Sequence, residues 1–229
     1  MFGGSTCDNL KLEATHQFYK NQVLTNSIPT LIFAGDLQLS TGFSNTWQTL
    51  GTKGIVTKSE NNILYEIDHK PASNFYRKYY GDLILEPIGC GLAVFEENQD
   101  DYYIRATNQR IDASEMEVTM MGDIPQGASV QLTEPNRTDI LNGVKTSISN
   151  AINNYPGNQP EFLLCFSCAA RRIFLGQDIV QEWQEIKSTL PEILPFFGFY
   201  SYGEIAPLKD NGKSSFHNFT LISLVVGTN

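Results

Sequence analysis

The order of hydrophobic patterns along this chain of 229 residues most strongly constrains its fold. Segments with the alternating or continuous apolar pattern of strands dominate the chain as far as Pro135. A helical pattern follows over residues 138–155, then an apolar strand pattern over 161–174, a second helical pattern over 177–191 and two closing strand patterns. Because strands and helices do not alternate regularly, the sequence predicts an α+β fold, a mostly antiparallel sheet with two or three amphipathic helices.

Three segments have the periodicity and end signals of helices. Residues 70–81 begin with Pro71 in the first turn and end at Gly81, which suits the position just past a helix. Residues 138–155 carry apolar side chains at steps of three and four, which predicts one buried face. For residues 177–191 the predicted inward side chains are Ile179, Val180, Trp183, Ile186 and Leu190.

Strand predictions near the two ends of the chain rest on shorter patterns. Residues 30–40, TLIFAGDLQLS, have the composition of a buried strand, whereas residues 40–54 are rich in Gly, Ser and Thr and predict a loop. Residues 196–207, FFGFYSYGEIAP, and residues 214–227 predict two strands joined by a short polar loop, which we expect to form a closing hairpin.

Composition and charge narrow the class of protein. Hydrophobic residues make up 41% of the chain and charged residues 18%, which is enough apolar surface for a core. The net charge of −9 argues against a nucleic-acid surface and against docking on anionic membranes. We find neither a secretory signal nor an apolar stretch of membrane-spanning length, so we expect a cytoplasmic protein without membrane insertion and with reduced thiols.

The spacing of Cys165 and Cys168 matches that of redox and zinc motifs, but the rest of such a site is missing. A structural zinc ion needs four ligands, and the remaining cysteines, Cys7 and Cys90, form no second pair. The sequence also lacks phosphate-binding loops, the dinucleotide fingerprint and HExxH. We therefore expect no cofactor and no metal, and no signature of a nucleotide enzyme is present.

Polar residues at the ends of two predicted strands form the candidate ligand site. Arg171 and Arg172 follow an apolar strand, and at least one of them must reach either solvent or a carboxylate. Glu204 follows an aromatic run and a glycine, where it suits the amine of a ligand whose carboxylate Arg171 would hold. Alternatively, Arg171 and Glu204 pair with each other and hold the sheet together. The predicted ligand-binding residues are Arg171, Tyr202, Gly203, Glu204, His217, Asn218 and Cys168.

Several of these segments resemble the FIST family. The pattern GFYSYGEIAP, a polar loop and then FHNFTLISLVV is similar to the C-terminal half of the family, as is FSCAARRIFLG before a helix. With NNILYEIDHKPASNFYRKYYG, the resemblance covers about residues 61–227. FGGSTCDN and TLIFAGDL resemble the end of the N-terminal domain of the family. The resemblance therefore implies an N-domain remnant over residues 1–58, which begins in mid-domain, and a FIST C domain over 59–229.

The resemblance implies a sensory, non-catalytic module of signal transduction that binds small molecules such as amino acids or their derivatives, so we expect no enzyme. It also implies a partner for output, either a separate signalling protein or the missing N-terminal half. Two alternatives stay open. One is a cysteine-dependent enzyme built on Cys168, His217 and Glu204. The other is an interaction module without a ligand, which exposes sheet edges and apolar surface to a partner.

Overall fold

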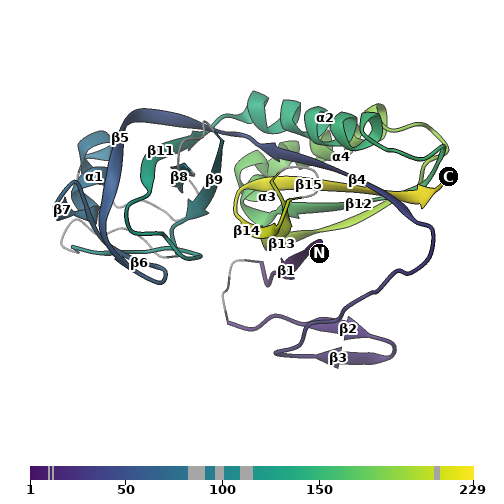
Figure 1. Cartoon of the computed structure of the whole chain (residues 1–229), viewed down its shortest axis with the longest axis horizontal. Coiled ribbons are helices and arrows are strands. Elements are labelled where there is room, and N and C mark those ends of the chain that lie inside the picture. Colours follow the sequence, from purple (N-terminus) through teal and green to yellow (C-terminus); the bar gives the residue numbers. More distant parts are fainter. Residues whose placement is uncertain (10, 12, 82–90, 96–100, 109–115, 209–211) are drawn as a thin grey trace. The chain divides into compact units, whose positions relative to one another are not determined.

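The computed structural model describes residues 1–9, 11, 13–81, 91–95, 101–108, 116–208 and 212–229. It confirms the α+β class, with helices and mostly antiparallel sheets (Figure 1). The chain forms two compact units. The first consists of Met1–Ser44, Leu141–Phe216 and Thr220–Asn229, and the second consists of Asn45–Ile140 and His217–Phe219.

The first unit is built on a sheet with the strand order β1-β13-β12-β15-β4, in which β14 also pairs with β13. A separate two-stranded ribbon, β2-β3, lies in its N-terminal part. The elements are β1 (Gly3–Thr6), β2 (Gln17–Tyr19), β3 (Gln22–Leu24), β4 (Gln38–Asn45), α2 (Arg137–Asn153), β12 (Gln159–Cys168), α3 (Ala169–Leu175), a 3₁₀ turn (Gly176–Asp178), α4 (Ile179–Thr189), β13 (Phe196–Pro207), β14 (Ser214–His217) and β15 (Thr220–Thr228).

Helices α2 and α4 lie along one face of this sheet (Figure 1). The predicted apolar stripe of α2 is confirmed, because Val144 and Ile148 are fully buried against the sheet. Ile186 and Leu190 at the end of α4 pack into the same core, together with Leu163 of β12. The core of the first unit therefore lies between these two helices and the strands β12 and β15.

The two closing strands of the prediction are not neighbours. Strand β12 separates them, since it pairs in parallel with β13 and antiparallel with β15. Only the short β14 pairs with β13, and residues 209–211 of the intervening polar loop lie outside the described residues. A parallel β12–β13 pair needs a crossover connection, which α3 and α4 provide.

The assignments for residues 30–40 and 40–54 were wrong. Residues 30–37 form no strand, and the segment read as a loop holds β4 and the start of β5 (Trp47–Glu60). In β4 the buried side alternates through Ser40, Gly42 and Ser44. These residues are small because the backbone of α2 lies directly against them: Ser40 Oγ donates to the carbonyl of Ala151, and Ser147 Oγ donates to that of Gly42.

The second unit is built on a sheet with the strand order β10-β6-β5-β11-β8-β9, and β7 pairs with β6. Helix α1 packs on it through Ala72 and Tyr76, with Leu64 and Met120 in the same core, and α1 ends at Gly81 as predicted. Its remaining elements are β6 (Ile63–Ile67), β7 (Lys70–Pro71), α1 (Ala72–Tyr80), β8 (Gly91–Phe95), β9 (Tyr102–Ala106), β10 (Val118–Thr119) and β11 (Ser129–Pro135).

The predicted orientation of helix α4 was wrong in one respect that matters for the site. Val180 and Trp183 were expected inside, but 56% and 50% of their surfaces are exposed. Glu182 takes the inward position instead and is 1% exposed. None of the helices among the described residues is both long and apolar enough to cross a bilayer.

Candidate functional site

Arg171 is buried, and its partner is a carboxylate that the sequence analysis did not identify. The strand expected over residues 161–174 ends at Cys168, so Arg171 lies on α3 rather than on β12. Its Nε donates to Glu182 Oε1 over 2.9 Å, and Nη2 lies 2.9 Å from the same oxygen. The crossover between β12 and β13 thus closes with an ion pair between its two helices.

Glu182 also accepts hydrogen bonds from both parallel strands. Ser167 Oγ of β12 donates to Oε1 over 3.2 Å, and the hydroxyl of Tyr200 on β13 donates to Oε2. Burial raises the pKa of the Tyr200 phenol, and the adjacent Glu182 carboxylate raises it further. Tyr200 therefore stays protonated and acts as a donor that ties β13 to α4.

Glu204 lies in the same unit and is fully buried. Ser201 Oγ donates to its Oε1 over 2.7 Å, and Thr220 donates to its Oε2 from Oγ1 over 2.7 Å and from its backbone N over 3.4 Å. Burial raises the pKa of Glu204 to about 8, while these hydrogen bonds and the charge of Arg171 act in the opposite direction. Arg171 and Glu204 thus each have other partners than the ion pair considered from the sequence.

The buried polar cluster combines residues from both parallel strands, both crossover helices and the start of β15. Ser201 joins its two halves, because Ser201 Oγ also donates to the carbonyl of Ser167 over 3.4 Å. Burying such groups costs stability unless they are hydrogen-bonded, and this arrangement supplies the bonds. The cluster consists of Ser167, Arg171, Glu182, Tyr200, Ser201, Glu204 and Thr220.

Replacing Glu204 with glutamine is expected to remove a pH dependence of stability. The pKa of Glu204 rises from 4.5 to about 8 on folding, so between these values the folded protein holds a proton that the unfolded chain has released. The contribution of this protonation to the free energy of unfolding is complete below pH 4.5 and is lost as the pH rises through about 8. Urea unfolding across this range should show the free energy of unfolding falling by up to about 1 kcal/mol per pH unit more in the parent than in the variant. Parallel curves would contradict the assignment.

The other predicted site residues are divided between the two units. Cys168 ends β12 and is buried, and Gly203 is buried in β13. Tyr202 is half-buried, and its hydroxyl donates to the carboxylate of Asp8. His217 and Asn218 belong to the second unit, where Asn218 Oδ1 accepts a hydrogen bond from the backbone N of Ala106 over 3.1 Å. The first unit therefore holds Arg171, Cys168, Tyr202, Gly203 and Glu204.

The cysteines among the described residues have no disulfide. Cys7, Cys165 and Cys168 are free, and Cys90 lies outside the described residues. Burial raises the pKa of the Cys165 thiol to about 12, which keeps it protonated at neutral pH. The described part of the chain holds no group of His, Cys, Asp and Glu side chains arranged to bind a metal ion.

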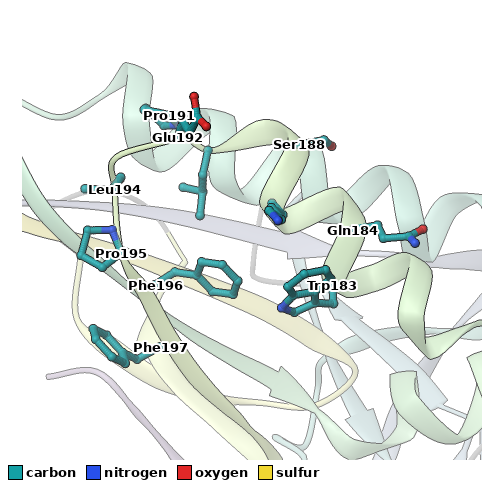
Figure 2. Close-up of a pocket in the computed structure, with 11 residues that line it drawn as sticks. Trp183, Gln184, Ser188, Pro191, Glu192, Leu194, Pro195, Phe196 and Phe197 are labelled. Atoms are coloured by element: carbon teal, nitrogen blue, oxygen red, sulfur yellow. The ribbon is translucent and has the colours of Figure 1, made fainter.

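A groove of about 800 Å³ lies between α4 and the start of β13 (Figure 2). Trp183 forms one wall and Phe196 of β13 faces it, whereas the ring of Phe197, the next residue of the strand, points away from Trp183. Leucine and proline side chains of the connection between the two elements extend the apolar lining, and a few polar groups stand among them. The lining residues are Trp183, Gln184, Lys187, Ser188, Leu190, Pro191, Glu192, Leu194, Pro195, Phe196 and Phe197.

Sequence reasoning missed both Glu182 and this groove. A signal for Glu182 was present, because Glu182, Ile186 and Leu190 are spaced by four residues and share one row of the helix surface. A carboxylate in a buried row, soon after an arginine that needs a partner, indicates an ion pair. No sequence pattern indicated the groove. The amphipathic pattern of this helix is equally compatible with Trp183 in the core and with Trp183 at the surface.

Two domain models of one family match this chain. The FIST N domain matches residues 1–70, and the FIST C domain matches residues 72–207. An uncharacterized protein of Methanocaldococcus jannaschii is 24% identical over 227 residues, which cover 89% of this chain and 41% of that protein. The chain thus spans about two-fifths of the length of this curated relative. No solved structure matches.

Proposed function

Because this chain belongs to the FIST family, whose domains are associated with sensory signal transduction, we propose that it binds a small molecule in the groove between α4 and β13. FIST domains are generally sensory, non-catalytic modules. In this proposal the ligand is an amino acid or a derivative of one, and the groove is where it is sensed.

The observation that carries the proposal is the size and lining of the groove. Small-molecule sites have volumes of roughly 300–1,000 Å³ and are mostly apolar, with a few polar groups that orient the ligand. The groove has a volume of about 800 Å³, three aromatic side chains and the polar groups of Gln184, Lys187 and Ser188. Trp183 and Phe197 are half or more exposed, which is costly for side chains that no ligand covers.

We place the ligand-binding site in the groove and not, as predicted from the sequence, at Arg171 and Glu204. Both side chains are fully buried, and Glu182, Ser201 and Thr220 already occupy the groups that a ligand would contact. The polar cluster shares the elements α4 and β13 with the groove. Glu182 directly precedes Trp183, and Tyr200 lies three positions after Phe197.

This proximity gives the sensor a route for its signal. The groove walls are α4 and β13, and the hydrogen bond from Tyr200 of β13 to Glu182 of α4 joins the same two elements. In this proposal a ligand that changes the distance between α4 and β13 also changes the geometry of that hydrogen bond. A separate signalling protein, or the N-terminal half of a longer chain, would receive the change as a partner of the module.

The two alternatives have unequal support. A cysteine enzyme would need an exposed thiolate, whereas Cys168 is 4% exposed. An interaction module has one observation in its favour, because Leu31, Ile32 and Ile193 of the first unit are each more than 70% exposed. Such surface also suits the output partner of a sensor, so this alternative adds to the proposal more than it competes with it.

The test uses Trp183 as its reporter. The chain has two tryptophans; Trp47 is fully buried and Trp183 is half-exposed, so acrylamide should quench Trp183 selectively. A bound amino acid or N-acetyl amino acid is expected to protect Trp183 from quenching. It should also raise the free energy of unfolding by about 2.7 kcal/mol at a hundredfold excess over Kd.

Two variants make the result specific to the groove. Trp183→Leu should abolish the ligand-induced thermal shift, because it removes one groove wall from the exposed side of α4. Val180→Ala is the matched control, since Val180 is similarly exposed on the same helix but outside the groove lining. If a broad set of amino acids and N-acetyl derivatives neither protects Trp183 nor shifts unfolding, the proposal is wrong.

A further inference from the structure

We infer that the groove selects ligands that carry a carboxylate and an apolar body but no free amine, such as amino acids acylated at the amine. This inference rests on the proposed function and narrows its ligand class. It depends on the charged and neutral polar groups of the groove and on its apolar volume.

The first observation is a lysine that stands over an aromatic ring of the groove. Lys187 follows Trp183 by four residues, so both lie on the same side of α4. Its Nζ lies 5.2 Å from the centroid of the Trp183 ring, and both residues line the groove. Lys187 has no ion pair with any residue that the structure describes. Its ammonium is therefore held at the ring and available to a ligand carboxylate.

The second observation concerns the carboxylates near Lys187. Glu192 is the acidic residue among the lining residues, and in Figure 2 its carboxylate points away from Trp183 and Phe196. Glu185 of the same helix lies outside the lining and is held by Lys145, whose Nζ is 3.1 Å from Glu185 Oε2. A ligand ammonium near the rings would meet the positive charge of Lys187 without a compensating partner.

The third observation concerns the apolar volume and a neutral polar group. A groove of about 800 Å³ lies in the range that holds drug-sized ligands, so a single amino acid would leave much of it empty. An acyl group would cover Phe196, which faces Trp183. The carboxamide of Gln184 offers both a donor and an acceptor, which matches the amide that replaces a free amine.

The experiment uses four probes that share one aromatic side chain and differ in charge. They are N-acetylphenylalanine (anion), N-acetylphenylalanine amide (neutral), phenylalanine (zwitterion) and phenylalanine amide (cation). Protection of Trp183 from acrylamide gives each Kd. We expect the anion to bind tightest and the cation weakest. The anion should bind about fivefold tighter than the neutral probe, the size expected of an exposed ion pair.

Substitution of Lys187 tests the origin of this order. Lys187→Gln should abolish the preference for the anion over the neutral probe, and Lys187→Glu should reverse it in favour of the cation. Lys70→Gln makes the same charge change at an exposed position in the second unit and should leave the order unchanged.

The outcomes separate this inference from the proposed function. Tightest binding of phenylalanine itself, or equal binding of all four probes, would overturn the inference and leave the groove as the ligand site. The same holds if Lys187→Gln keeps the preference for the anion. If none of the four probes, nor any other amino acid, protects Trp183, the proposed function fails as well.

Discussion

Replacing Glu182 with alanine is expected to lower the free energy of unfolding by about 3–5 kcal/mol, the cost of breaking a buried ion pair by removing one partner. Glu182 and Arg171 are almost completely buried, so the variant removes the carboxylate from a guanidinium that water does not reach. The hydroxyls of Ser167 and Tyr200 lose their acceptor in the same step. Denaturant unfolding at neutral pH measures the loss.

Glu185 provides a matched control on the same helix. It pairs with Lys145 at 3.1 Å, but these side chains are 28% and 54% exposed. Glu185→Ala is therefore expected to cost at most about 1 kcal/mol. Equal losses for Glu182→Ala and Glu185→Ala would show that the Arg171–Glu182 pair is not buried as described.

A double variant distinguishes the loss of a pair from the loss of packing. Arg171→Met combined with Glu182→Gln removes both charges and keeps an amide oxygen for Ser167 and Tyr200 to donate to. Replacing a buried pair by neutral groups of similar volume costs far less than removing one charge. The double variant should thus be more stable than Glu182→Ala. If it is less stable, the argument from buried charge is wrong.

Replacing Gly42 with alanine is expected to destabilise the protein by about 3 kcal/mol or more, because the new methyl group has no space. A Cβ at position 42 would lie 1.7 Å from the backbone oxygen of Ser147. That oxygen belongs to helix α2, so relief requires the whole helix to move off β4. The shift would also break the hydrogen bond from Ser147 Oγ to the carbonyl of Gly42. Thermal unfolding followed by circular dichroism measures the effect.

Gly3 is the control for this substitution. It also lies in a strand of the same sheet, but a Cβ there would meet nothing within 4 Å. Gly3→Ala should leave the unfolding temperature unchanged within a few degrees. A Gly42→Ala variant as stable as Gly3→Ala would mean that α2 does not pack on β4 at the distance described.

Local patterns predicted the elements that bury one continuous apolar stripe. Helix α2 falls where its periodicity placed it, because apolar residues at steps of three and four bury one face only in a helix. The continuous apolar run from residue 161 gave strand β12, but residues 169–174 at its end form α3, because such a run suits a buried strand and a buried helix equally well. Strand β4 was missed for the opposite reason. Its buried residues are Ser40, Gly42 and Ser44, whose small size reflects a close helix rather than a loop.

The candidate site was predicted less completely than the fold. The cost of burying an arginine charge left two environments open for Arg171, solvent or a carboxylate, and Glu182 was not identified as its partner. The rotation of α4 about its axis places Glu182 inside and Trp183 outside. The amphipathic pattern does not predict this rotation, because either residue fits a position in the core. His217 and Glu204 are both among the predicted ligand-binding residues, and they belong to different units.

The amino-acid sequence by itself determined the α+β class and the positions of α1 and α2, because these follow from interactions between residues close in the chain. Only the tertiary structure decided the strand order with β12 between β13 and β15, the partner of Arg171 and the groove beside Trp183. The reason is that contacts between distant residues depend on how the crossover helices pack on the sheet. One hydrophobic pattern along a sequence is compatible with more than one such packing.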